Sequence, residues 1–129
     1  MSKLNELSAL VQKLSGTTIP VNRPFIGEGA YNIESGIVTG WFKNVFEKDP
    51  TTVYPVRPEF VGHKKPEILM GKKSGVDNIE IWTKKLGIKV TEEEGMEVLR
   101  RVKLKAHDLK RTLKESEFKK IVKEVKREQ

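Results

Sequence analysis

The chain has 129 residues, no cysteine and a formal net charge of +7, and 33% of its residues are charged. This length suits one domain or two small subdomains around a modest core, and the composition lies outside the disordered range. The lack of cysteine excludes a disulfide scaffold and a thiolate metal site, and no apolar run reaches the roughly eighteen residues that a membrane span needs, so we expect a cytoplasmic protein.

The first predicted element is a helix with a single apolar stripe. The stripe is formed at helical spacing by Leu4, Leu7, Val11 and Leu14. Gly16 follows as a typical C-terminal stop. The stretch 17–24 contains two prolines and is predicted to be extended, because residues before proline avoid the helical conformation.

A glycine-rich stretch, PFIGEGAYNIESGIVTGWFKN, occupies residues 24–44. Its four glycines are too many for a plain helix, and it is too apolar for a plain loop. It lacks the third glycine and the preceding buried strand of a dinucleotide-binding fingerprint. Trp41, Phe42 and Phe46 have the spacing of a helix face that packs against a neighbour.

The middle of the chain has weaker signals of secondary structure. Residues 48–66 contain four prolines and are predicted to be irregular. Residues 66–71, PEILMG, are a candidate short strand that ends at a glycine turn.

Three short helices are predicted in the second half of the chain. Their apolar stripes are Val76, Ile79, Trp82 and Leu86, then Met96, Leu99, Val102 and Ala106, and finally Phe118, Ile121, Val122 and Val125. Capping boxes are indicated by Ser74 with Asp77, by Thr91 with Glu94 and by Thr112 with Glu115. These signals predict that the three helices pack together.

The elements together predict a mainly α fold with a little β. A small glycine-rich α/β subdomain is followed by a three-helix subdomain. We place the first helix at residues 1–16, the glycine-rich subdomain at 17–71 and the helical subdomain at 72–129.

The turn GKKSG at residues 71–75 is a candidate anion contact. A turn before a helix leaves backbone N–H groups free, and two lysines stand beside them. Lys72, Lys73 and Ser74 are therefore candidate cofactor-binding residues, although the turn lacks the spacing of a Walker loop and a helix-capping turn is the alternative. His63 and His107 are too far apart to indicate a metal site, so no metal ligand is predicted.

The positive charge is concentrated at the end of the chain. Residues 1–99 hold 13 Lys or Arg and 13 Asp or Glu, whereas residues 100–129 hold 12 and 5. A basic end can bind nucleic acid or an acidic partner. The regular apolar period and the lack of interleaved aromatic residues favour a solvated helix face instead. A non-enzymatic, nucleic-acid-binding module is the alternative.

Several short motifs follow one another in a recognisable order. They are Gly-Glu at 27–28, Glu-Ser-Gly-Ile at 34–37, Lys-Asn at 43–44, Pro-Glu at 58–59, Val-Gly at 61–62, Gly-Lys-Lys-Ser-Gly at 71–75 and Leu-Gly at 86–87. In this order and spacing, residues 4–125 resemble the region that follows the barrel in the 2-isopropylmalate, homocitrate and citramalate synthases, a family of HMG-CoA-lyase-like TIM-barrel acyltransferases. Residues 1–16 resemble the end of the last barrel helix.

The resemblance implies a reaction and a place for this region in it. The family enzymes join the acetyl group of acetyl-CoA to a 2-oxo acid in a Claisen-type condensation, with a divalent metal in the barrel holding the oxo acid. The first part of the post-barrel region lies over the active site of the partner subunit in a dimer. By this resemblance the stretch 24–44 is a lid, with a packing element in a small domain as the alternative. Glu28 and Tyr54 are the candidate catalytic residues, Glu28 by binding loop backbone or a polar group of the partner.

The sequence departs from the family pattern at three histidines. Ile33 and Val38 stand in place of two of them, and Lys73 stands in place of a third. The histidine replaced by Val38 is held to take part in proton transfer, which valine cannot do. The spacing from Tyr54 to the following motif is also one residue short.

A barrel needs about 250 residues, so this chain cannot include one. We expect acetyl-CoA and the metal to be bound by the missing barrel, with no cofactor and no activity in this chain alone. The expected partner is a second copy in a homodimer or a separate TIM-barrel subunit, and the chain is either an excised piece of a longer protein or the product of a split gene. A regulatory protein that competes for a synthase dimer surface is a further alternative, and the sequence does not select the 2-oxo acid.

Overall fold

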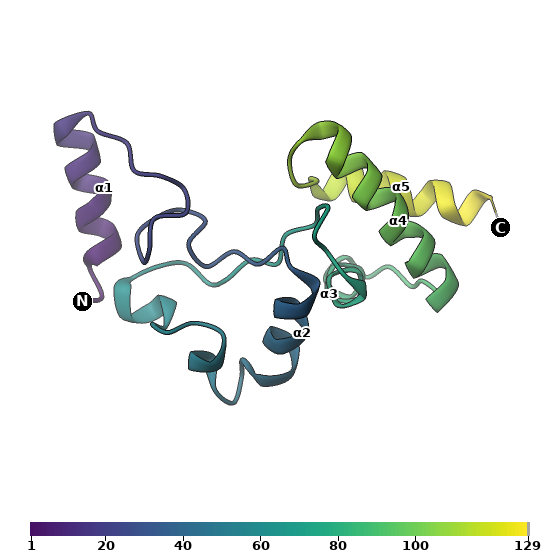
Figure 1. Cartoon of the computed structure of the whole chain (residues 1–129), viewed down its shortest axis with the longest axis horizontal. Helices are drawn as coiled ribbons and strands as arrows, with labels where there is room; N and C mark the ends of the chain where they lie inside the picture. Colours follow the sequence, from purple (N-terminus) through teal and green to yellow (C-terminus); the bar gives the residue numbers. More distant parts are fainter. Residues whose placement is uncertain (129) are drawn as a thin grey trace. The chain divides into compact units, whose positions relative to one another are not determined.

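The computed structural model describes residues 1–128 and is mainly helical (Figure 1). Within these residues the α-helices are α1 (Leu4–Ser15), α2 (Gly36–Val45), α3 (Val76–Leu86), α4 (Glu92–Leu109) and α5 (Glu115–Arg127), with two short 3-10 helices, η1 (Pro50–Thr52) and η2 (Pro58–Val61). The strand predicted at 66–71 is reduced to one parallel bridge between Ile33 and Ile68. The prediction of a mainly α fold with a little β is confirmed.

The chain divides into two compact units. Unit 1 comprises residues 1–32 and 44–67, and unit 2 comprises residues 33–43 together with the chain from residue 68 onward. The segment 33–43, which holds most of α2, therefore belongs with the C-terminal helices. The domain boundaries expected after residues 16 and 71 stay predictions.

The first helix forms where its apolar stripe predicts it. It ends at Gly16, which adopts the left-handed conformation (φ 67°) and donates its backbone N–H to Gln12 O at 3.0 Å. No residue of α1 is buried, and Leu14 at its end is 77% exposed. Leu7, Leu10 and Val11 are each at least half exposed, so most of the apolar side of α1 is not covered within unit 1.

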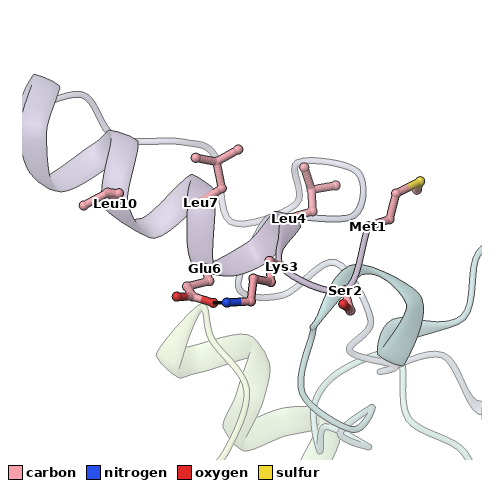
Figure 2. Close-up of a pocket in the computed structure, with 7 residues that line it drawn as sticks. All are labelled: Met1, Ser2, Lys3, Leu4, Glu6, Leu7 and Leu10. Carbon is pink, nitrogen blue, oxygen red and sulfur yellow. Dashed lines mark ion pairs between the residues drawn. The ribbon is translucent and has the colours of Figure 1, made fainter.

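Figure 2 shows the first turns of this helix. Leu4 and Leu7 project from one side, and Lys3 and Glu6 form an ion pair at 3.9 Å on the opposite side. A hollow of about 630 Å³ is lined only by residues between Met1 and Leu10. Because one segment supplies every lining residue, this hollow has a single wall and is an open apolar face.

Unit 2 has a continuous hydrophobic core, built from α3, α4 and α5. Helix α4 packs against both α3 and α5 (Figure 1). At the centre, the ring of Trp82 meets the ring of Phe118 edge-on at 5.3 Å, and the indole Nε1–H donates to Ile68 O at 2.7 Å. The other buried members are Met70, Ile79, Val98, Leu99, Val102, Ala106, Leu113, Ile121, Val122 and Val125. The predicted packing of three helices is confirmed.

One of the three predicted capping boxes is present. The hydroxyl of Thr91 accepts from Glu94 N at 3.1 Å, and the Glu94 carboxylate accepts from Thr91 N at 2.7 Å. Each partner therefore satisfies one free N–H at the start of α4.

The other two capping predictions are wrong by one or more residues. Helix α3 is capped by Asn78, whose Oδ1 accepts from Gly75 N at 2.9 Å, because the Ser74 hydroxyl is already bonded within the preceding turn. Helix α5 begins at Glu115, after Leu113 N has bonded to Met70 O at 2.7 Å. That tertiary hydrogen bond holds residue 113 in the core, so α5 begins only after this residue.

Unit 1 has few buried side chains. Its buried apolar side chains among those described are Tyr31, Tyr54, Pro58 and Val61. The proline-rich stretch 48–66 forms η1 and η2, each of which begins at a proline, where the missing N–H costs nothing. Of the aromatic residues predicted to pack from residues 41–46, Phe46 meets Tyr54 edge-on at 6.1 Å, whereas Trp41 is 55% exposed.

No helix within residues 1–128 is both long enough and apolar enough to cross a membrane.

Candidate functional site

The segment 20–32 of unit 1, which we call the glycine loop, is folded tightly on itself. Gly29 N donates to Val21 O at 2.9 Å, and Gly27 N donates to Arg23 O at 2.8 Å. A Cβ atom at Gly27 would collide with Val21 O, so only glycine allows this approach of backbone to backbone. Phe25 has a positive φ of 67°, which is uncommon for a residue other than glycine.

A stack of aromatic rings supports the glycine loop. The ring of Tyr31 meets Tyr54 edge-on at 5.2 Å and His63 at 4.8 Å. The hydroxyl of Tyr54 donates to Tyr31 O at 2.7 Å, and His63 Nε2 lies 2.9 Å from Gly27 O. Because a carbonyl oxygen only accepts, His63 donates from Nε2 and holds the loop at Gly27.

Glu28 is exposed at the edge of a groove that the glycine loop forms with segment 63–67 and α1. Two hollows of about 250 and 180 Å³ share Val21, Glu28, His63 and Lys64. Glu28 makes no hydrogen bond or ion pair with residues 1–128, so its carboxylate can accept from an incoming donor. The fixed loop backbone sets where this carboxylate stands.

Tyr54 lies in the same unit as Glu28 but not in the same groove. It is buried, and its hydroxyl is committed to Tyr31 O. The structure thus places one candidate catalytic residue at the surface and the other inside the aromatic stack beneath the loop. The catalytic roles of both stay predictions.

Burial of the two phenols has a consequence for alkaline pH. Burial, and then the charge of Glu59, raises the pKa of Tyr31 above its ordinary 10.0. Burial also raises the pKa of Tyr54, with the Tyr31 phenol adding to the rise. Tyr31 is 3% exposed, and its hydroxyl has no hydrogen-bond partner among residues 1–128.

We expect the folded chain to become less stable as the pH rises above about 10. The unfolded chain then releases phenolic protons that the folded chain retains, so the free energy of unfolding falls. Tyrosinate absorbance should rise at higher pH in the native chain than in urea. Both tyrosines of the chain lie in unit 1, and Tyr54→Phe should leave one delayed transition. Titration of both tyrosines near pH 10 in the native chain would contradict the burial of their phenols.

In unit 2 the motifs at 34–36 and 71–75 form one structure, which we call the motif clasp. The Glu34 carboxylate accepts from Lys73 N at 3.0 Å, and Gly36 N donates to Lys73 O at 3.1 Å. Asn78 Nδ2 donates to Glu34 O at 3.1 Å. A Cβ at Gly36 would lie 2.7 Å from the Cα of Gly75, so the two backbones touch.

The three predicted anion contacts take different places in this clasp. Ser74 is buried, and its hydroxyl accepts from Gly71 N at 2.8 Å and lies 3.4 Å from Leu69 O. Its hydroxyl therefore closes the turn. The ammonium groups of Lys72 and Lys73 are exposed. Anion binding by these residues stays a prediction.

Ile33 and Val38, which stand where the resemblance implies histidines, are both in unit 2. Ile33 is buried and pairs with Ile68, with Leu69 N donating to Ile33 O at 2.7 Å. An apolar side chain suits this place, since a buried imidazole would need a hydrogen-bond partner.

His63 is a residue that the sequence analysis did not assign to any site. Its position directly after the Pro-Glu and Val-Gly motifs at 58–62 is a signal that was available. Its contacts with Tyr31 and Gly27 became visible only in the structure. Within residues 1–128 there is no group of three or more His, Cys, Asp or Glu that could hold a metal ion.

Comparison with known proteins shows the family of the chain. Residues 25–110 match the family described as homocitrate synthase post-HMGL domain-like. The chain is 43% identical over 100 residues to a probable 2-isopropylmalate synthase of Methanopyrus kandleri, a match that covers 78% of this chain and 19% of the relative. It is 33% identical over 126 residues to the (R)-citramalate synthase CimA of Methanocaldococcus jannaschii (97% and 24%) and 32% identical over 123 residues to the homocitrate synthase AksA of Methanothermobacter thermautotrophicus (95% and 30%).

The chain belongs to the homocitrate synthase post-HMGL domain-like family, and it corresponds to the region that follows the barrel in 2-isopropylmalate, citramalate and homocitrate synthases. The resemblance stated from the motifs is thereby confirmed. The chain spans between about a fifth and a third of the length of these relatives.

Proposed function

We propose that this chain is the lid and dimerisation region of an acyltransferase that condenses acetyl-CoA with a 2-oxo acid. It acts in the cytoplasm on an active site supplied by a TIM barrel, and it is inactive alone. Membership of the family supports the accessory role. The single observation that carries the lid role is the free carboxylate of Glu28 on a loop fixed by the aromatic stack.

A lid must present a polar group in a fixed position when it closes. The glycine loop meets this requirement because its turn is bonded internally and is held by His63 at Gly27. Glu28 next to that contact has no partner among residues 1–128. In the closed state its carboxylate accepts a hydrogen bond from the barrel or the substrate.

The uncovered face of α1 supports docking to another subunit. Leu7, Leu10 and Val11 are each at least half exposed, and contiguous exposed apolar side chains favour association. A second copy of the chain or a barrel subunit would cover this face. The metal and acetyl-CoA would be held by that barrel, since residues 1–128 have no group of three or more side chains that could hold a metal ion.

Reconstitution tests this proposal. The chain is mixed with a purified barrel subunit, the assembly is confirmed by size-exclusion chromatography, and thiol release from acetyl-CoA is measured with pyruvate and other 2-oxo acids. We expect activity only in the mixture. Glu28→Gln should lower kcat by about 10- to 100-fold, because one positioned polar contact to the reacting groups is lost.

Glu67→Gln is the matched control. Glu67 is another exposed carboxylate that lines the groove, but it lies outside the glycine loop. Its replacement should leave kcat within about twofold of the parent, in line with a surface substitution away from the contact. Equal losses in both variants, or activity of the chain without a barrel, would refute the proposal.

A further inference from the structure

A hollow in unit 2 has a concentration of positive charge. It has a volume of about 510 Å³ and lies between the turn at Lys72 and the end of α4. Three permanent cations, Lys72, Lys110 and Arg111, line it together with His107, against one carboxylate, that of Glu34. We call this hollow the basic hollow.

The walls of the basic hollow are held together by the core. Leu113 N donates to Met70 O at 2.7 Å, which keeps the segment after α4 beside the turn that begins at Gly71. A Cβ at Gly71 would lie 3.2 Å from the Cγ2 of Thr112, so the two segments are in close contact. The cationic residues that line the hollow therefore come from two places far apart in the sequence.

Two of the three cations are available to a ligand. Lys72 and Lys110 make no side-chain hydrogen bond or ion pair with residues 1–128. Arg111 is held by a two-pronged ion pair with Glu117, at 2.9 and 2.7 Å. This guanidinium, together with the hydrogen bond from Lys114 N, lowers the pKa of the Glu117 carboxyl to about 2. One oxygen of the Glu34 carboxylate is engaged, since it accepts from Lys73 N at 3.0 Å.

Lys110 occupies a backbone position that disfavours it. It follows the last residue of α4 with φ 52°, the left-handed conformation that glycine adopts most easily. A side chain there costs about 1 kcal/mol relative to glycine. A lysine at the end of a helix also interacts favourably with the helix dipole. That interaction can account for Lys110, but it does not account for the presence of Lys72, from a different segment, beside the same hollow.

We infer that the basic hollow binds the phosphate or pyrophosphate group of a small molecule. Phosphate oxygens are strong acceptors for converging lysine and arginine donors. A volume near 500 Å³ is in the range of small-molecule sites and exceeds the size of a bare ion. No aromatic side chain lines the hollow, so it lacks the stacking platform of a single-stranded nucleic-acid site. The inference does not depend on the proposed function.

Titration of the whole chain with inorganic pyrophosphate and with phosphate, followed by amide NMR at low salt, tests this inference. We expect saturable shifts at residues 71–73 and 106–112. Lys72→Gln and Lys110→Gly should each weaken binding by about fivefold to tenfold, as expected for one charge-assisted contact. Lys110→Gly should be at least as stable as the parent, so its lost affinity is not a folding defect.

Two further variants distinguish binding at the basic hollow from non-specific attraction to a positively charged chain. Glu117→Gln should strengthen binding, because it releases Arg111 from its ion pair. Lys103→Gln removes an exposed lysine of α4 that does not line the hollow, and it should leave affinity unchanged. Absence of saturable shifts, or equal weakening by Lys103→Gln, would overturn the inference. Tighter binding of a single-stranded oligonucleotide that Lys110→Gly does not affect would also overturn it.

Discussion

Phe118→Ala is expected to lower the free energy of unfolding by about 3–5 kcal/mol. The Phe118 side chain is fully buried, and its ring meets Trp82 edge-on at 5.3 Å. Alanine would remove that contact and leave a cavity where α3, α4 and α5 meet. The neighbours are held by their own helices, so they can refill the space only in part. A small domain with a stability of 5–15 kcal/mol would lose much of it.

Urea unfolding followed by tryptophan fluorescence measures this loss, because Trp82 reports directly on the contact. Leu104→Ala is the matched control, since Leu104 is an apolar residue of α4 that is 55% exposed. Its replacement should change the free energy of unfolding by no more than about 0.5 kcal/mol. A Phe118→Ala variant as stable as the control would mean that the helices do not share this core.

Gly36→Ala and Gly95→Ala are expected to change stability in opposite directions. At Gly36 a Cβ would lie 2.7 Å from the Cα of Gly75 and 2.8 Å from its N. Both are backbone atoms of the motif clasp, so no side chain can rotate away, and such overpacking costs about 1–3 kcal/mol. At Gly95, inside α4, the nearest atom is the Cγ2 of Ile79 at 3.9 Å, which is ordinary contact.

Alanine at Gly95 should therefore stabilise the chain by about 0.5–1 kcal/mol, the difference in helix propensity between the two residues. Thermal or urea unfolding of the two variants measures both the expected loss and the expected gain in the free energy of unfolding. The amide signal of Lys73 supplies a local check, because Gly36→Ala should disturb its bond to Glu34. Stabilisation by both substitutions would show that the two backbones are not in contact.

The helices are the part of the fold that local sequence predicts best. The stripe at Phe118, Ile121, Val122 and Val125 places α5, and all four residues are buried as expected. The prediction succeeds because a side chain at every third or fourth position must lie on one face of a helix, whatever surrounds it. The same rule places α1 but does not show that its apolar side is uncovered.

Some residues of the candidate sites were predictable from the sequence, but their arrangement was not. Glu34 and Lys73 both belong to motifs found in the sequence, yet their bond joins residues 39 positions apart. Ser74 was expected to cap a helix and instead closes a turn, since tertiary contacts choose among the bonds that a hydroxyl can make. His63 was left unassigned because its partners, Tyr31 and Gly27, come from distant segments.

For this protein the sequence alone determined the family, the helical fold class and the positions of the main helices, because periodic apolar residues and ordered motifs are local properties of the chain. Only the tertiary structure decided which motifs touch, that Glu28 is free while Tyr54 is buried, and that Lys72 and Lys110 face one hollow. These are contacts between distant segments, and packing of the core, not local preference, brings such segments together.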